Sequence, residues 1–180
     1  MSDADEIKKL QELIGKVWMR ARINAFAHRE AMNNSRFRES LWYVITISTS
    51  LLSMLFMTLS YINNNQSTVS LFFLLLSIIF AFCSLFATIF SNHMRYSITF
   101  EEHKFTQNSY MLLAQRTRVA KNPTISKEKL NELYNDLERD FSDIKARGIE
   151  PQDKHFKIAN KIFQERKDDN ISSEALSFNI

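Results

Sequence analysis

The sequence predicts an all-α integral membrane protein with a two-helix transmembrane hairpin and amphipathic cytoplasmic helices before and after it. Glycine and proline number two each among 180 residues, far below average usages of roughly 7% and 5%, and strand-and-turn folds need more of both. No Asp, Glu, Lys or Arg occurs between Leu41 and Met94. The charges lie on either side of this apolar stretch, which indicates membrane helices flanked by water-exposed ones.

Two segments within that stretch, residues 41–62 and 69–90, are long enough to cross a membrane. Each has 22 residues without a charge, and at about 1.5 Å per residue it extends roughly 33 Å, more than a hydrocarbon core of about 30 Å. Residues 63–68 read NNNQST, and we expect an extracytoplasmic loop, because Asn and Ser satisfy backbone groups that lipid would leave unpaired. Two buried helices of a soluble domain are disfavoured, since a chain this short could not cover both.

Basic residues flank the two spans but not the loop between them. Before span one come Arg20, Arg22, Arg29, Arg36 and Arg38, and after span two come Arg95, Lys104, Arg116, Arg118 and Lys121. The positive-inside bias therefore predicts that both termini are cytoplasmic. We expect the residues that anchor the spans at the membrane interface to be Arg36, Arg38, Trp42, Tyr43, Tyr61, Arg95 and Tyr96.

The N-terminal cytoplasmic part, residues 1–40, is predicted to hold an amphipathic helix over residues 3 to about 32. Its apolar positions recur at helical spacing: Ile7, Leu10, Ile14, Val17, Ala21 and His28. We expect a break at Asn33, Asn34 and Ser35 before span one.

The cytoplasmic region after span two, residues 91–167, begins without Gly or Pro until Pro123, so we expect span two to continue as one helix into the cytoplasm. Ile98, Phe105, Leu112 and Val119 recur at intervals of seven. This series has two interpretations, a seam between copies of the chain or packing on the other cytoplasmic helices.

Pro123 is predicted to end that segment and Ser126 to cap the next helix, which Gly148 follows. The next helix carries a candidate face for contact with another copy or a partner protein: Leu130, Leu133, Leu137, Phe141 and Ile144. Pro151 suits the first turn of a last helix, to about Lys167, with Phe156, Ala159 and Phe163 on one side. The polar tail, residues 168–180, is expected to be mobile.

The sequence lacks the motifs of catalysis and metal binding. Its four histidines form no HExxH or paired Cys/His spacing, and two glycines cannot build a phosphate-binding loop. We therefore expect a protein that is not an enzyme and uses no metal or cofactor. The net charge is +3 and the pI is near 9.0. Because the Lys and Arg residues are interleaved with Asp and Glu outside the membrane flanks, contact with anionic lipid is favoured over direct nucleic-acid binding.

Hydroxyl side chains form a stripe on each span. The candidates for lining a pore or packing the helices are Thr46, Ser50, Ser53, Ser60, Ser77, Ser84 and Thr88. In one interpretation both stripes pack helices closely and bond across them. In the other, one stripe packs the hairpin and the second lines a water-accessible path in a homo-oligomer, because two spans cannot enclose a pore.

The layout resembles the SLATT family, the two-transmembrane effector domains of bacterial nucleotide-signalling and conflict systems. The resemblance is carried by "WMRARINAFAHREAMNNSRFRES" leading into span one, by the short polar loop, and by "RYSITFEEHKFTQNSYMLLAQRTRVA" after span two. It covers about residues 10 to 165. These are patterns of residue type and architecture, with no catalytic signature.

The resemblance implies an oligomeric effector of the bacterial inner membrane that breaches the membrane in antiviral defence, so that the infected cell stops growing or dies. A separate cytoplasmic sensor or enzyme would then supply the trigger. The alternative is a membrane-tethered scaffold or regulatory subunit that holds a partner enzyme, such as a reverse transcriptase or a nucleotide synthase, through the Leu130–Ile144 face.

Overall fold

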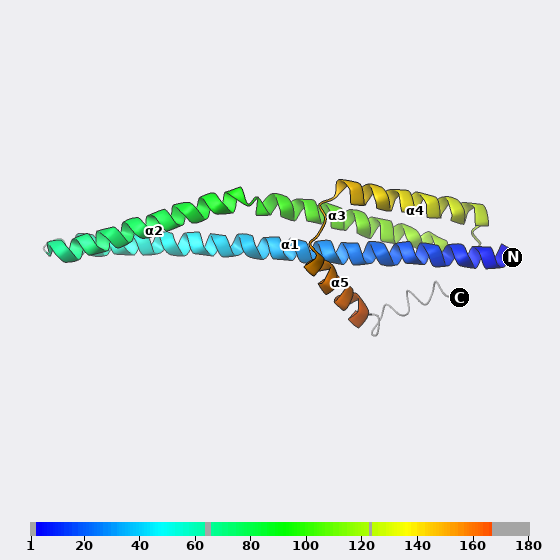
Figure 1. Ribbon diagram of the computed structural model, residues 1–180, viewed down its shortest axis with the longest axis horizontal. Helices are drawn as coiled ribbons and strands as arrows, with labels where there is room; N and C mark the ends of the chain where they lie inside the picture. Colours follow the sequence, from blue (N-terminus) through cyan, green and yellow to red (C-terminus); the bar gives the residue numbers. More distant parts are fainter. Residues whose placement is uncertain (1–2, 64–65, 123, 167–180) are drawn as a thin grey trace. The chain divides into compact units, whose positions relative to one another are not determined.

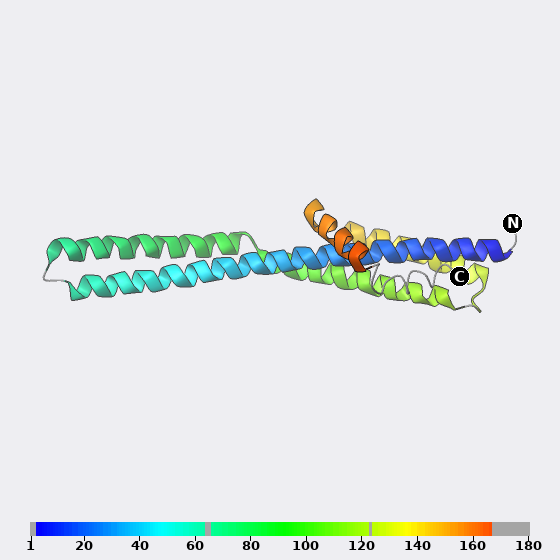
Figure 2. The same ribbon diagram turned by 90° about the horizontal axis from the view of Figure 1, so that it is seen from below.

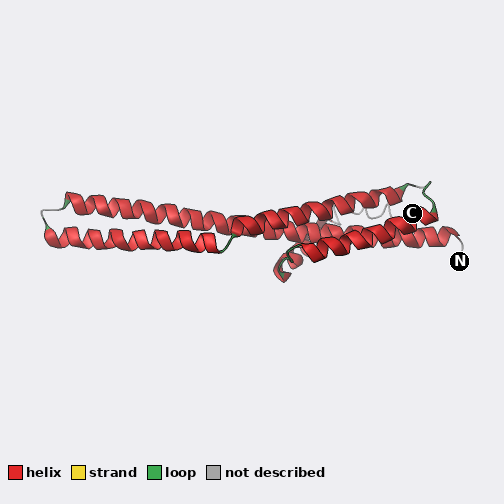
Figure 3. Ribbon diagram, turned by 90° about the horizontal axis from the view of Figure 1, so that it is seen from above, coloured by secondary structure: helices red, strands yellow, loops and turns green. Residues whose placement is uncertain are grey.

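The computed structural model describes residues 3–63, 66–122 and 124–166, and these form helices joined by short turns and loops, with no strand among them (Figure 3). The elements are α1 (Asp3–Ile62), α2 (Ser67–His93), α3 (Tyr96–Arg116), the 3₁₀ segment η1 (Thr117–Lys121), α4 (Lys127–Arg147) and α5 (Asp153–Arg166). The predicted all-α class is confirmed. The predicted mobile tail and Pro123 lie outside the described residues.

The chain divides into two compact units. The first, called the bundle here, comprises Met1–Asn33 and Phe100–Ile180, and the second, called the hairpin, comprises Asn34–Thr99. Within the bundle, α3 and α4 run alongside the first part of α1 (Figures 1 and 2). Within the hairpin, α2 runs back along the second part of α1.

The bundle is held by one apolar core to which all of its helices contribute. The fully buried or nearly buried members are Ile14, Val17, Trp18, Ala21, Ala25, Tyr110, Leu113, Ala114, Ala120, Leu130, Leu137 and Phe163. The apolar face predicted for the N-terminal helix is confirmed, because Ile14, Val17 and Ala21 are fully buried and His28 nearly so. In α5, the ring of Phe163 lies 6.2 Å from that of Trp18, so the side predicted for the last helix also faces the core.

The candidate partner face on α4 turns inward. Leu130 and Leu137 are fully buried, and Leu133, Phe141 and Ile144 pack against the same core. The expectation that this face is open to a partner is therefore wrong for this structure, because the chain's own helices cover it. An amphipathic pattern indicates that a face is buried but does not say by which molecule.

The ends of α4 agree with the sequence prediction. Ser126 is the N-cap, and its side chain accepts a hydrogen bond from the backbone N–H of Lys129 at 3.4 Å. Lys127 forms ion pairs with Asp3 and Glu6 of α1. The start of α4 is therefore fixed to α1 as well as capped.

Gly148, the C-cap of α4, allows a close approach to α3. A Cβ atom on Gly148 would lie 2.7 Å from Cγ2 of Thr106, and Thr106 is buried with its hydroxyl donating to the carbonyl of Glu102 at 2.9 Å. We predict that Gly148→Ala destabilises the bundle by about 1 to 3 kcal/mol through this overlap. Urea unfolding of the full chain in detergent measures it, and Gly148→Ala with Thr106→Ser should recover part of the loss. Unchanged stability of the single variant would contradict the close contact.

Two helix boundaries differ from the prediction. α1 is continuous through Asn33, Asn34 and Ser35, because these residues keep their backbone N–H groups and each costs less than about 0.7 kcal/mol in a helix. Conversely, span two does not continue as one helix: α2 ends at His93, and α3 begins at Tyr96 after a turn in which Arg95 has φ 47°. This left-handed conformation is costly for arginine, and position 95 holds neither Gly nor Asn, the residues that would have predicted it.

Candidate functional site

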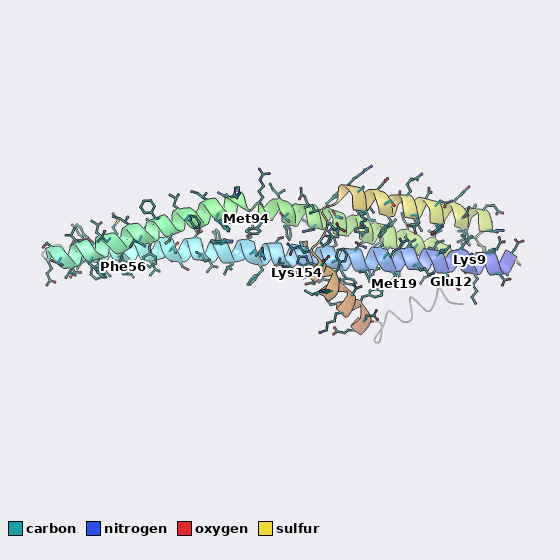
Figure 4. All side chains as sticks on the ribbon, in the orientation of Figure 1. Lys9, Glu12, Met19, Phe56, Met94 and Lys154 are labelled. Carbon is teal, nitrogen blue, oxygen red and sulfur yellow. The ribbon has the colours of Figure 1, made fainter. Side chains whose placement is uncertain are left out.

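The hairpin presents the apolar surface expected of a membrane-spanning pair. Two helical segments, Asp3–Ile62 and Ser67–Lys121, contain windows long and apolar enough to cross a membrane, and only 0% and 6% of those windows are buried by the rest of the chain. Helices of a soluble core would be covered. Phe56 of α1, labelled in Figure 4, stacks on Phe73 and Phe80 of α2 with ring centroids 6.2 and 5.5 Å away.

Serine pairs join the two helices near the loop and in the middle of the hairpin. Ser60 and Ser70 each donate a hydrogen bond to the other's carbonyl oxygen, at 2.9 and 3.0 Å. The Ser53 hydroxyl donates to the carbonyl oxygen of Ser77 at 3.0 Å and lies 3.3 Å from its Oγ. Ser60 and Ser77 are buried, so small side chains allow the helices to approach closely here.

A third contact lies toward the other end of the hairpin. Oγ of Ser84 lies 2.7 Å from Oγ of Ser50 and 3.3 Å from the carbonyl oxygen of Thr46. Thr88 is exposed and donates to the carbonyl oxygen of Ser84 on its own helix at 2.9 Å. Among the predicted hydroxyls, those of Thr46 and Thr88 make no described hydrogen bond across the hairpin, although the backbone carbonyl of Thr46 accepts one from Ser84.

These contacts follow one antiparallel register with a period of seven residues. Positions 46, 53 and 60 of α1 meet positions 84, 77 and 70 of α2 in that order. A seven-residue repeat keeps one seam facing the partner helix over several turns. The two hydroxyl stripes therefore face each other within a single hairpin, and we call this contact the serine seam.

The predicted interface anchors show mixed burial. Trp42 is half-buried, with its ring centroid 4.7 Å from that of Phe90, and Tyr96 is also half-buried. The remaining candidates are exposed: Arg36, Arg38, Tyr43, Tyr61 and Arg95. Exposed Tyr and Arg at these positions are free to reach lipid headgroups.

Three of the four histidines, His28, His103 and His155, lie buried in the bundle, although no regular sequence spacing links them. Nδ1 of His28 lies 3.1 Å from Nδ1 of His103, and the two rings meet edge to face with centroids 5.2 Å apart. His155 is also buried and lowers the pKa of His103 electrostatically, although burial is the larger cause. Burial, with His103 second, lowers the pKa of His28 to about 4.

The pair is therefore neutral near pH 7, and one Nδ1 must carry the proton that the other accepts. Among the residues the structure describes, no group of three or more His, Cys, Asp or Glu side chains is arranged to hold a metal. The sequence signal for burial was present in His28, which continues the apolar spacing of the N-terminal helix. The signal for its pairing with His103 was absent.

The seven-residue series on α3 and η1 is open to solvent. The exposed fractions are 50% for Ile98, 74% for Phe105, 62% for Leu112 and 55% for Val119. The interpretation that these residues pack on the chain's other helices is therefore wrong, and the seam between copies stays a prediction.

Comparison of the chain with models of known protein families, with characterised proteins and with solved structures finds no match.

Proposed function

We propose that this chain is a non-enzymatic effector of the bacterial inner membrane that oligomerises and opens a gated pore or disrupts the bilayer. The observation that carries the proposal is the serine seam, which runs between the two helices of the apolar hairpin. A simple membrane anchor requires length and apolar surface only. Hydroxyl groups repeated over the length of both helices are not required for anchoring, and here they bond across the hairpin.

The serine seam suits a structure that opens and closes. Hydrogen bonds between polar side chains of transmembrane helices contribute about 0.6 kcal/mol each on average. Water can replace such bonds at little cost, whereas a leucine seam would exclude water. We propose that the hydroxyls bond to each other in the closed state and to water in the open one, with several hairpins enclosing the path.

The cellular context rests on the sequence. The positive-inside bias supports cytoplasmic termini, and therefore a cytoplasmic bundle. The resemblance to the SLATT family supports a role in antiviral defence, in which a separate sensor or enzyme acts on the bundle to open the pore. Lipid is the other expected partner.

The test is the membrane potential of bacteria that express the chain together with its genomic neighbours, read with a voltage-sensitive dye before and after phage challenge. We predict depolarisation by the wild type, reduced about tenfold in Ser53→Ala/Ser77→Ala, because an apolar seam resists wetting. Alanine removes the hydroxyls without adding bulk to the contact. Thr58→Ala is the matched control, since Thr58 is exposed and donates only to Met54 of its own helix at 2.9 Å.

Two results would contradict the proposal in different ways. Equal depolarisation by the wild type and the double variant would show that the serine seam does not line the path. A polarised membrane with defence intact would favour the membrane-tethered scaffold instead.

A further inference from the structure

An apolar surface of the bundle is left uncovered by the described helices. Phe105 and Leu112 of α3 and Val119 of η1 project from it and are each more than half exposed. Beside them lies a groove of about 440 Å³ between α3 and α4, whose walls include Phe105, Leu112, Leu113 and Ile144. Ridge and groove therefore share residues and form one continuous surface, called the α3 face here.

We propose that the α3 face is the interface of the bundle with a second copy of this chain, in parallel orientation. The proposal rests on the proposed function to the extent that it assumes membrane insertion. It goes further by assigning the contact between copies to named residues. A seam between copies was one of two interpretations of the sequence, and the exposure of these side chains leaves it as the one compatible with the structure.

Membrane insertion favours a second copy over an unrelated occupant. All copies enter the bilayer with the same topology, so an oligomer symmetric about the membrane normal places identical residues at the same depth. Phe105 of one copy can then meet Phe105 of the next, and Leu112 can meet Leu112. A spacing of seven residues keeps such pairs on one line along two parallel helices.

The charges around the α3 face are compatible with self-association. The groove carries two cationic side chains, Arg116 and Arg147, and two anionic ones, Asp140 and Asp143. Arg116 pairs with Asp140 within the chain. The groove therefore has no excess of either sign and meets its own copy without the like-charge repulsion that suppresses wrong partners.

The size of the ridge also agrees with contact inside a membrane. Three half-exposed apolar side chains amount to a few hundred Å², roughly the largest patch that a monomer carries, and less than the 800 Å² or so per partner of a stable complex in solution. Copies held in one bilayer are already oriented and concentrated, which lowers the free energy needed for association. A short ridge is sufficient under those conditions.

The experiment is site-directed crosslinking of the full chain in native membranes. In a Cys83→Ala background, which removes the sole cysteine, Phe105→Cys and Leu112→Cys are treated with a short bis-maleimide. Lys104→Cys and Gln115→Cys are matched controls, because both positions are exposed on the same helix about a quarter turn away from the ridge. We expect at least about fivefold more covalent dimer at the ridge positions, given the short reach of the crosslink.

A second variant tests the same contact without relying on a cysteine at each ridge position. Adding Phe105→Glu to Leu112→Cys should abolish the Leu112→Cys dimer through like-charge repulsion, while the exposed position leaves the fold intact. Dimer yields equal to those of the controls, or insensitive to Phe105→Glu, would overturn the inference.

The dye assay on the same cells separates the two proposals. Crosslinking at the ridge without depolarisation would support the α3 face and reject the pore. Depolarisation without crosslinking at the ridge would support the pore and reject the α3 face as the interface between copies.

Discussion

Leu137→Ala is expected to destabilise the bundle by about 3 kcal/mol. Leu137 is fully buried in a core formed with α1 and α3, and truncating a buried leucine removes apolar contacts and leaves a cavity, at a cost of about 2 to 5 kcal/mol. This change also distinguishes the two assignments of the α4 face. A leucine held for a partner protein would be exposed in the isolated chain, and its truncation would leave stability nearly unchanged.

The measurement is urea unfolding of the full chain in detergent at low protein concentration. Trp18 reports on the core, because it is nearly buried against Phe163, and Trp42→Phe makes it the only tryptophan. Leu112→Ala is the matched control, since it makes the same chemical change at an exposed position and should alter stability by less than about 0.5 kcal/mol. Equal effects of the two variants would contradict the observed packing of α4.

The elements of the fold could be predicted because their signals are local. The uncharged stretch predicts the positions of the two apolar helical segments. α1 ends at Ile62, where the first span is expected to end, and α2 begins at Ser67, two residues before the expected start of the second span. The spacing of apolar residues predicted which faces of α1, α4 and α5 are buried. It could not predict what covers them, because periodicity describes one helix and burial requires two.

The features that the sequence missed depend on contacts between distant segments. The sequence predicts both hydroxyl stripes but not whether they face each other. A short loop makes two helices adjacent without fixing how each is rotated about its own axis. The seven-residue register of the serine seam sets that rotation. The pairing of His28 with His103 has the same origin, since 75 residues separate them.

Acid is expected to destabilise the bundle, and His28 is the main reason. In the folded chain the pKa of His28 is about 4, against 6.5 for an exposed histidine. Between these values the unfolded chain binds a proton that the folded chain does not, so stability falls as pH decreases from 6.5 toward 4 and is independent of this group above 6.5. The pKa of His103 is lowered as well and acts in the same direction.

The expected loss attributable to His28 is about 2 kcal/mol between pH 7 and pH 4. A shift of one pKa unit corresponds to about 1.4 kcal/mol, and solvent screening reduces the total. Urea unfolding at several pH values, followed through Trp18, should show this loss in the wild type and a smaller one in His28→Gln, whose amide can still bond to His103.

His93→Gln is the control, because His93 is exposed and lies outside the bundle, and it should keep the wild-type profile. Parallel profiles for the wild type and His28→Gln would mean that protonation of other groups governs the acid response. A reduced slope in His28→Gln alone would instead identify the buried histidine pair as the point at which protons act on the bundle.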